Sequence, residues 1–128
     1  MLHITSLYAA LLALIIIFLA YKVVVFRKTK HVGLGDNGDK DGLQAIRVHA
    51  NAVEYIPMMI ILMGLYEANG GSNLILNIIG VLAVVARVLH AFGLTKSKGV
   101  SFGRFYGTAL TWLITVFLAI LNIYTYFI

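Results

Sequence analysis

Four long apolar runs constrain this chain more than any other feature of its sequence. A helix that crosses a bilayer needs about 20 mostly apolar residues, and the runs cover residues 2–26, 43–68, 74–94 and 102–128. Apolar residues make up 61% of the 128 residues, against roughly 45–50% in an ordinary soluble chain. A chain this small cannot bury so much apolar surface inside a soluble globule. We therefore predict an all-α membrane protein in which residues 1–128 form one domain, a bundle of four transmembrane helices.

The charge and the cysteine content exclude several classes of function. The net charge is +5, which in a soluble protein would suggest nucleic acid as a partner. The apolar composition excludes an ordinary nucleic-acid binder. The chain has no cysteine, which excludes disulfides, thiolate metal sites and a cysteine nucleophile. Any thiol chemistry would therefore need a thiol that a substrate supplies.

The placement of the positive charges predicts the orientation in the membrane. The N-terminus, the second connection (67–73) and the C-terminus contain no lysine or arginine. All the lysines and arginines lie in or beside the first and third connections: Lys22, Arg27, Lys28, Lys30, Lys40, Arg47, Arg87, Lys96, Lys98 and Arg104. The positive-inside rule places these connections in the cytoplasm and both termini on the non-cytoplasmic side. The short, minimal form of the chain favours a prokaryotic inner membrane, and the first run is too long for a cleaved signal peptide.

Two short motifs in the first connection predict only a solvated turn. The glycines of residues 33–38 fit a dinucleotide-binding pattern, but that pattern requires a preceding strand, and here a helix precedes it. Residues 37–42 resemble the beginning of a calcium-binding loop, but Val48 stands where the bidentate glutamate belongs. His90 has no second histidine within reach on its helix, so we predict no metal site.

A polar stripe on the second helix is the most informative feature for function. At 100° per residue, Arg47, Asn51 and Glu54 fall on one stripe, with Tyr55 beside it. Ionisable groups at this depth seldom face lipid. One interpretation is an internal ion-pair network. Arg47 and Glu54 lie two turns apart and do not meet well directly, so Asn51 would bridge them. Alternatively, Arg87 would reach Glu54 from the third helix. The other interpretation is a polar pocket for a zwitterionic or anionic ligand. An arginine can bind a carboxylate through two parallel hydrogen bonds, and a glutamate can bind an ammonium group.

The third and fourth helices add further cations. Arg87 and His90 lie one turn apart on one face of the third helix. Arg87 either snorkels to the head groups or contacts a ligand or Glu54. Arg104 is either an interfacial anchor among aromatic residues or a cation over the mouth of the pocket, where it would favour a thiolate. Pro57 predicts a kink in the second helix, which either only serves helix packing or opens space beside Glu54.

The second-helix pattern resembles the MAPEG family, the membrane-associated proteins in eicosanoid and glutathione metabolism, through Arg47, Asn51, Glu54, Tyr55 and Pro57. The third-helix segment 86–93 is similar to that of the same family. The resemblance covers essentially the whole chain and is strongest to the small prokaryotic members. It implies a homotrimer of four-helix subunits, with glutathione bound between neighbouring subunits near the cytoplasmic side.

The resemblance also implies a role for each candidate residue. Glutathione would be the co-substrate, and its contacts would be Arg47, Asn51, Glu54, Tyr55, Arg87 and His90. Arg104 would be the catalytic residue that stabilises the thiolate. Leu94 stands where the leukotriene synthase branch has a tyrosine, which argues against that activity. The implied activity is that of a glutathione transferase or peroxidase, whose apolar second substrate, a lipophilic electrophile or hydroperoxide, enters from the bilayer.

Two other functions compete with this interpretation. A non-catalytic scaffold or binding subunit would retain the pocket without turnover. A small multidrug-type exporter would also have four helices and a membrane carboxylate such as Glu54. The exporter is disfavoured because its key glutamate is expected in the first helix, where this chain has no acid, and because Arg47 would repel a cationic drug.

Overall fold

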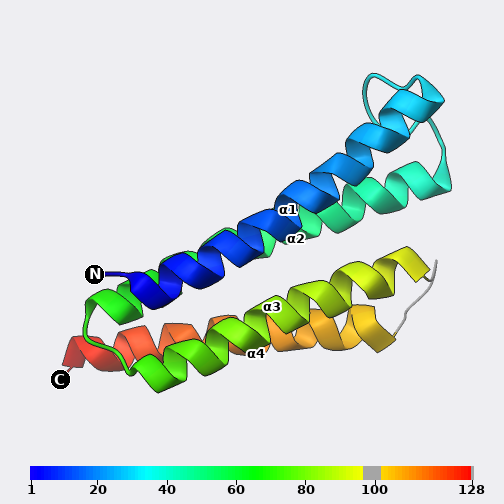
Figure 1. Cartoon of the computed structure of the whole chain (residues 1–128). Coiled ribbons are helices and arrows are strands. Elements are labelled where there is room, and N and C mark those ends of the chain that lie inside the picture. Colours follow the sequence, from blue (N-terminus) through cyan, green and yellow to red (C-terminus); the bar gives the residue numbers. More distant parts are fainter. Residues whose placement is uncertain (97–101, 128) are drawn as a thin grey trace.

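The computed structural model describes residues 1–96 and 102–127, apart from the side chains of residues 94–96 and 104. This part contains four helices and no strand (Figure 1): α1 (His3–Lys30), α2 (Lys40–Ala68), α3 (Asn73–Lys96) and α4 (Phe102–Phe127). Each helix contains a segment long and apolar enough to cross a membrane. The prediction of an all-α membrane protein built from four transmembrane helices is therefore confirmed.

The connection between α1 and α2 is shorter than the sequence analysis predicted. Helix α1 continues past residue 26 to Lys30, because basic side chains in its last turn interact favourably with the helix dipole. It ends where His31 adopts the left-handed conformation, with a φ of 54°. Helix α2 already begins at Lys40, three residues before the predicted start, because Asp39 caps it. Pro57 lies inside α2 without interrupting it.

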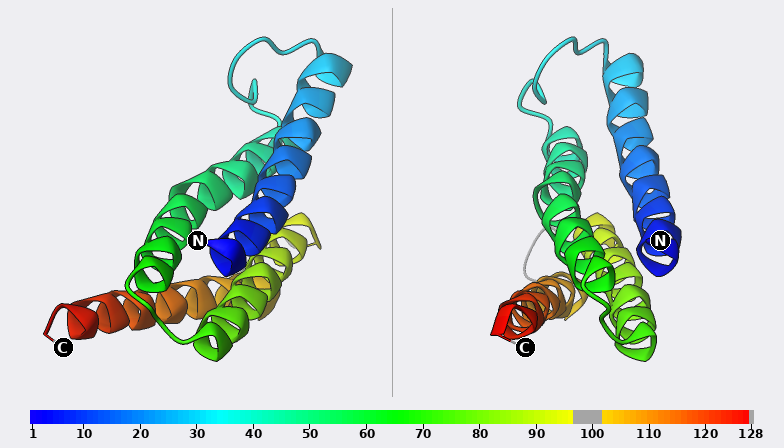
Figure 2. Two further views of the ribbon diagram at one scale, coloured as in Figure 1. Left: turned by 60° about the vertical axis from the view of Figure 1, so that its left-hand side comes forward. Right: turned by 90° about the vertical axis from the view of Figure 1, so that its left-hand side faces the viewer.

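The helices form two antiparallel pairs, α1 with α2 and α3 with α4, and the pairs cross each other (Figures 1 and 2). Helix α3 also contacts α1 and α2, and α2 contacts α4. Within the described ranges α1 and α4 do not touch. Both termini lie at one end of the bundle, and the α1–α2 connection lies at the other end (Figure 1). This arrangement places α2 and α3 at the centre of the bundle.

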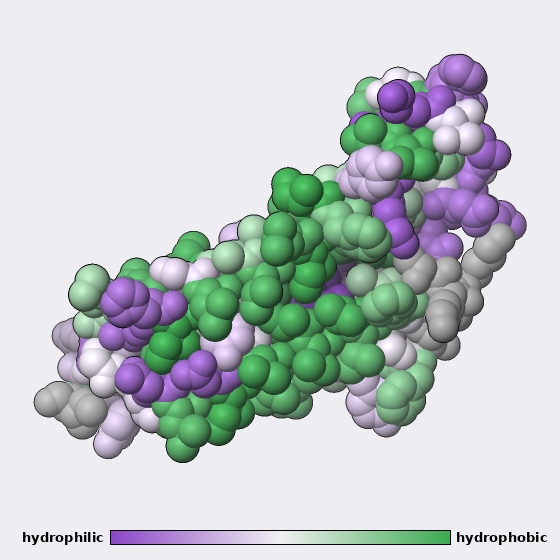
Figure 3. Space-filling model, viewed as in Figure 1, coloured by the Kyte–Doolittle hydropathy of each residue, from purple (hydrophilic) through white to green (hydrophobic). Residues whose placement is uncertain are grey.

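Apolar side chains fill the space between the helices and also cover their outer faces. The fully buried ones include Leu12, Ile56, Met59, Met63, Leu76 and Leu118. Large apolar side chains such as Leu14 and Leu113 are 67% exposed. Figure 3 shows a broad hydrophobic surface along the helices, with hydrophilic residues gathered towards the two ends. Lipid or another protein chain must cover this surface in the membrane.

Glycines bring α4 into backbone contact with α3. A Cβ atom on Gly103 would lie 2.8 Å from the carbonyl oxygen of Leu89, and one on Gly107 would lie 2.8 Å from the carbonyl oxygen of Ala86. Only a residue without a side chain allows this approach, as is common where membrane helices pack. The contact holds the first turns of α4 against the part of α3 that carries Arg87.

Helix α1 packs on α3 in a similar way at the opposite end of the bundle. The ring of Tyr8 occupies the space that a Cβ atom on Gly80 would need. The Tyr8 hydroxyl donates a hydrogen bond to the side-chain oxygen of Asn77, with a length of 3.1 Å. A polar contact of this kind fixes the register of two apolar helices.

The N-terminus of α1 is capped by a carboxylate from α2. The backbone N–H groups of Ile4 and Thr5 donate to the two Glu67 oxygens, at 3.0 and 2.7 Å. The local N-cap residue, Leu2, has no side chain that could do so. A negative charge also interacts favourably with the positive end of the helix dipole. Glu67 therefore binds the end of α2 to the beginning of α1.

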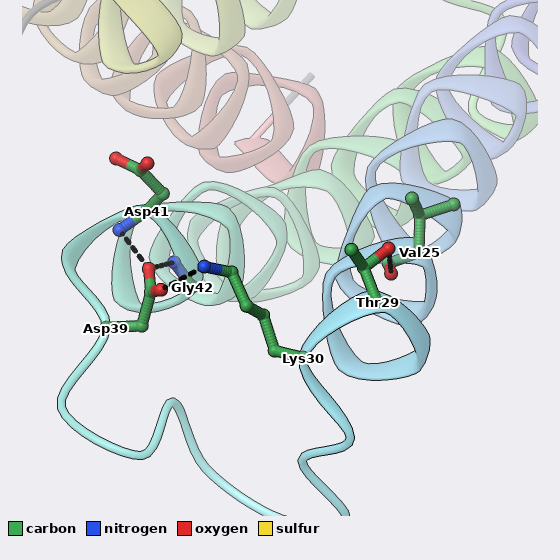
Figure 4. Close-up of polar contacts among 6 residues, drawn as sticks. All are labelled: Val25, Thr29, Lys30, Asp39, Asp41 and Gly42. Atoms are coloured by element: carbon green, nitrogen blue, oxygen red, sulfur yellow. Dashed lines mark hydrogen bonds and ion pairs between the residues drawn. The ribbon is translucent and has the colours of Figure 1, made fainter.

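Asp39 caps the beginning of α2 (Figure 4). Its carboxylate accepts hydrogen bonds from the backbone N–H groups of Asp41 and Gly42, at 2.9 and 3.1 Å. The Lys30 ammonium at the end of α1 lies 3.3 Å from the second carboxylate oxygen. The Gly42 hydrogen bond and the Lys30 contact hold the pKa of Asp39 below its ordinary value of 3.8. The same carboxylate thus starts α2 and ties it to α1.

We predict that this cap makes stability depend on pH in acid. Because folding lowers the pKa of Asp39, its contribution is complete above the unfolded value of 3.8 and is lost as the pH falls through the lower folded value. Asp39→Ala should lower the thermal midpoint in detergent at neutral pH, and the difference from the unmodified protein should shrink below about pH 4. Asp36→Ala, which removes another carboxylate of the same connection that does not cap α2, is the control variant. A constant difference for Asp39→Ala across this range would contradict the cap.

Candidate functional site

The centre of the candidate site is an arginine buried between α2 and α3. The Arg87 side chain is 1% exposed. Its Nη2 group donates a hydrogen bond of 2.8 Å to the side-chain oxygen of Asn51 on α2. The sequence analysis expected Arg87 either to snorkel to the head groups or to reach a ligand or Glu54. The snorkelling alternative is wrong, because the guanidinium turns into the bundle, where Asn51 supplies the acceptor.

The remaining N–H groups of Arg87 are incompletely used. Its Nε and Nη1 atoms are buried and have no hydrogen-bond partner among the described residues. His90, which is 2% exposed, places its Nδ1 atom 3.4 Å from Nη2. Tyr55 on α2 lies close enough to interact electrostatically with the guanidinium. No carboxylate pairs with Arg87 in this part of the structure, so its charge lacks a direct counter-ion.

Arg47 and Glu54, the two charged residues of the α2 stripe, lie on the outside of the bundle. The Arg47 Nη1 atom is 4.0 Å from the Glu54 Oε1 atom, and the side chains are 60% and 52% exposed. The sequence analysis expected that these residues do not meet well directly, and the structure brings them together only as a long ion pair, beyond hydrogen-bond distance. They are seven residues apart and so share one face, and both side chains are long enough to span the two turns between them. The pair is accessible to a ligand or to another subunit.

The structure therefore divides the predicted stripe into an inner and an outer part. Asn51 is half-buried and belongs to the inner part with Arg87 and His90. Arg47 and Glu54 form the outer part, and the half-buried Tyr55 lies next to the inner part. On an ideal helix Asn51 points about 40–60° away from Arg47 and Glu54. This angular offset is the feature of the sequence that agrees with the division.

Two residues of the sequence analysis fall outside the described side chains. Arg104, the predicted catalytic residue, has its backbone in the first turn of α4, next to Gly103, but its side chain is not described. The side chain of Leu94 is likewise not described. The glycine contact with α3 brings the backbone of α4 at this point close to the α3 turn that carries His90.

The described site has the chemistry of a receptor for a charged polar molecule. Arg87 offers buried N–H donors to an anion, and Glu54 offers an exposed carboxylate to an ammonium group. Across residues 1–96 and 102–127, no group of three metal-ligating side chains comes together. The buried donors of Arg87 and the exposed carboxylate of Glu54 together suit an organic zwitterion.

Comparison with known proteins finds similarity along the whole bundle. The sequence model of the MAPEG family matches residues 5–124, which include parts of all four helices. Two relatives, one from Escherichia coli K12 and one from another strain of E. coli, are both named inner membrane protein YecN. Each is 39% identical over 90 residues, which cover 70% of this chain and 69% of the relative.

We predict that Asn51 is needed to keep Arg87 buried. Asn51→Leu removes the acceptor with little change in volume and should lower the free energy of unfolding by about 1–3 kcal/mol, the usual cost of an unsatisfied buried group. Adding Arg87→Met should restore part of that loss, because the double variant no longer buries a charge. Chemical denaturation in detergent measures both variants. Costs that simply add in the double variant would show that the two residues do not interact.

Proposed function

The chain belongs to the MAPEG family, and on this premise we propose that it is a glutathione-binding inner membrane protein. We infer that it acts as a glutathione transferase or glutathione-dependent peroxidase on lipophilic electrophiles or hydroperoxides. The four membrane-spanning helices and the name of the E. coli relatives support an inner membrane location. Its termini would lie on the non-cytoplasmic side, as the distribution of lysine and arginine predicts.

The observation that carries this proposal is the incompletely paired guanidinium of Arg87. A charged side chain inside a membrane span is costly unless it is paired. Asn51 provides one neutral acceptor, and the Nε and Nη1 groups have none among the described residues. A bound carboxylate would accept from these groups and neutralise the charge. The unused Nε and Nη1 donors of Arg87 thus favour an anionic ligand over a purely structural role.

Glutathione has groups that match the rest of the stripe. It carries two carboxylates, one ammonium and two amide bonds. Arg87 and Arg47 would each bind a carboxylate, and Glu54 would bind the ammonium. Asn51, Tyr55 and His90 would supply further hydrogen bonds. Binding would exchange the exposed contact between Arg47 and Glu54 for contacts with the ligand.

The exposure of Arg47 and Glu54 also supports the proposed homotrimer. Both residues lie within the span of α2, yet more than half of each side chain is exposed in the isolated chain. Facing lipid in this state is unfavourable for an ion pair. A neighbouring subunit would cover the pair and would close the glutathione site from the other side.

In the proposed reaction Arg104 stabilises the glutathione thiolate. A nearby guanidinium lowers the pKa of a thiol from about 8.5 towards neutrality. The thiolate sulfur would then bond to an electrophilic carbon, and the leaving group would depart with the electron pair. With a hydroperoxide, two glutathione molecules would be oxidised to the disulfide while the hydroperoxide is reduced to an alcohol and water. The lipophilic substrate would arrive through the bilayer.

A non-catalytic binding subunit is the alternative that one observation favours. Leu94 occupies the position of a tyrosine in the leukotriene synthase branch, so one hydroxyl expected there is missing. Such a protein would bind glutathione through the same stripe without turning it over. The exporter hypothesis loses support because Glu54 is already in contact with Arg47.

We predict saturable glutathione binding that depends on the stripe. Isothermal calorimetry on the detergent-purified protein should detect binding, and Arg87→Met and the double variant Arg47→Ala, Glu54→Gln should each weaken it at least tenfold, the effect of losing a charge-assisted contact. Lys28→Gln, which removes a positive charge from the last turn of α1, should bind glutathione like the unmodified protein. Absence of binding to the folded protein at millimolar glutathione would refute the proposal.

We also predict that Arg104 affects turnover more than affinity. Arg104→Gln should lower kcat by roughly 10²–10³, as expected when a group that stabilises developing charge is removed. Its pH–rate profile should shift upward, towards the pKa of about 8.5 of a free thiol. Glutathione affinity should change much less. Equal losses in affinity and kcat, with no shift in the profile, would count against a role in thiolate formation.

A further inference from the structure

A groove lies between α1 and α2 near their connection. Its volume is about 360 Å³, and it is lined by Leu19, Lys22, Asp41, Gln44, Ala45 and Val48. Leu19 and Val48 are almost completely buried and form its floor. Lys22 and Asp41 are exposed, and Gln44 and Ala45 are half-buried. The groove therefore runs from a polar mouth to a buried floor.

The α2 wall of this groove continues into the inner part of the candidate site. Asn51, which accepts the hydrogen bond from Arg87, falls within about 60° of Gln44 and Val48 on an ideal helix. Val48 precedes Asn51 by three residues, or about 4.5 Å along the axis. Tyr55, which interacts with the same guanidinium, lies on this face as well. The floor of the groove and the partners of Arg87 are therefore neighbours on one face of α2.

The α1 wall of the groove faces the same side of the bundle. Tyr8 marks the face of α1 that packs on α3, because its ring lies against Gly80. Leu19 and Lys22 fall within about 40° of Tyr8 on an ideal helix. Figures 1 and 2 show that the α1–α2 pair diverges from the α3–α4 pair towards the α1–α2 connection. The groove thus opens on the side of the α1–α2 pair where α3, which carries Arg87, packs farther into the bundle.

A ligand of Arg87 needs a polar approach to a side chain that is only 1% exposed. The buried Nε and Nη1 donors have no partner among the described residues, but a charged molecule cannot reach them through the hydrocarbon of the bilayer. The outer side of the stripe, with Arg47 and Glu54, would be covered by the neighbouring subunit of the proposed homotrimer. The groove supplies an approach from the aqueous end of the bundle instead.

We propose that this groove is the entrance through which a small carboxylate-bearing molecule reaches Arg87 from the end that we predict to be cytoplasmic. Lys22, at the mouth, attracts the carboxylate from water, and the Gln44 amide donates to it on the way in. The Lys22 ammonium lies 5.2 Å from the centre of the Phe18 ring, on a long side chain that is exposed. Asp41 already has an interaction of its own, so we assign it no contact with the ligand. The identity of the ligand as glutathione rests on the proposed function, whereas the route to Arg87 does not.

The proposal gives Lys22 a kinetic role rather than a role in the final complex. Gln44, on the wall of the same groove, lies about 10 Å along the axis from Asn51, the partner of Arg87. A cation at the mouth therefore guides entry and exit without holding the ligand once it is bound at Arg87. Removing this charge lowers the association and dissociation rate constants together and leaves Kd nearly unchanged. A residue that holds the bound ligand would instead act mainly on the dissociation rate constant.

The absence of cysteine from the chain allows a test of the route that needs no glutathione. In Asn51→Cys, a water-soluble anionic methanethiosulfonate should modify the thiol beside Arg87. Adding Ala45→Trp, which fills the groove, should slow this modification by about tenfold or more. Adding Val24→Trp, at an exposed position on the side of α1 away from the groove, is the matched control and should leave the rate unchanged. If Asn51→Cys does not fold, Tyr55→Cys on the same face of α2 replaces it. An unmodified thiol in the folded protein, or equal rates with and without Ala45→Trp, would overturn the proposal.

Stopped-flow kinetics with glutathione test the role of Lys22, and circular dichroism checks that each variant is folded. Lys22→Gln should lower the association rate constant about three- to tenfold, with a weaker dependence on salt, and the dissociation rate constant by the same factor. Lys22→Arg should keep both constants, as should the control Lys28→Gln at the same end of the bundle. A change in the dissociation rate constant alone, or an association rate constant equal to that of Lys28→Gln, would refute this role. If glutathione does not bind at all, the proposed function fails, and the rates of thiol modification still decide whether the groove leads to Arg87.

Discussion

The burial of the Arg87 guanidinium within a membrane-spanning helix is the constraint on which the candidate site depends. A charge in this position is tolerated only where the surrounding helices supply acceptors. Asn51 on α2 supplies one, and this hydrogen bond sets how α2 and α3 face each other in the middle of the bundle. The glycines of α4 then bring that helix into backbone contact with the same part of α3. The guanidinium thus joins α2 to α3, and its unused donors are the basis for proposing an anionic ligand.

Arg47 and Glu54 of α2 are exposed, in contrast to the buried Arg87. Arg47 and Glu54 contact each other on the outside of the bundle, within a segment that has the length and composition of a membrane span. The outer faces of the helices also expose many large apolar side chains. The apolar faces suit lipid, but the ion pair does not. This contrast is the physical reason for proposing that a second subunit, with glutathione between the subunits, covers the outer part of the stripe.

The ends of the bundle are held by carboxylates that cap helices. Glu67 at the end of α2 accepts from the first N–H groups of α1. Asp39 at the beginning of α2 is close to Lys30 at the end of α1. Both contacts join the same two helices, one at each end of the pair.

The sequence by itself determined the four membrane helices, because an apolar run of about 20 residues has no other stable state in a bilayer. It also placed Arg47, Asn51, Glu54 and Tyr55 near one another, because helical geometry depends only on spacing. Boundaries were less predictable, since Asp39 and the basic residues 27–30 extend the helices beyond the apolar runs.

The tertiary structure decided which polar groups meet. That Arg87 binds Asn51, that Glu67 caps a helix more than 60 residues away, and that Gly103 and Gly107 face the α3 backbone all depend on how separate helices pack. The contact of Arg47 with Glu54 depends on the reach and rotamers of two long side chains. Helical periodicity fixes the face on which a residue lies, but the partner on the neighbouring helix is set by packing between segments that are distant in the chain.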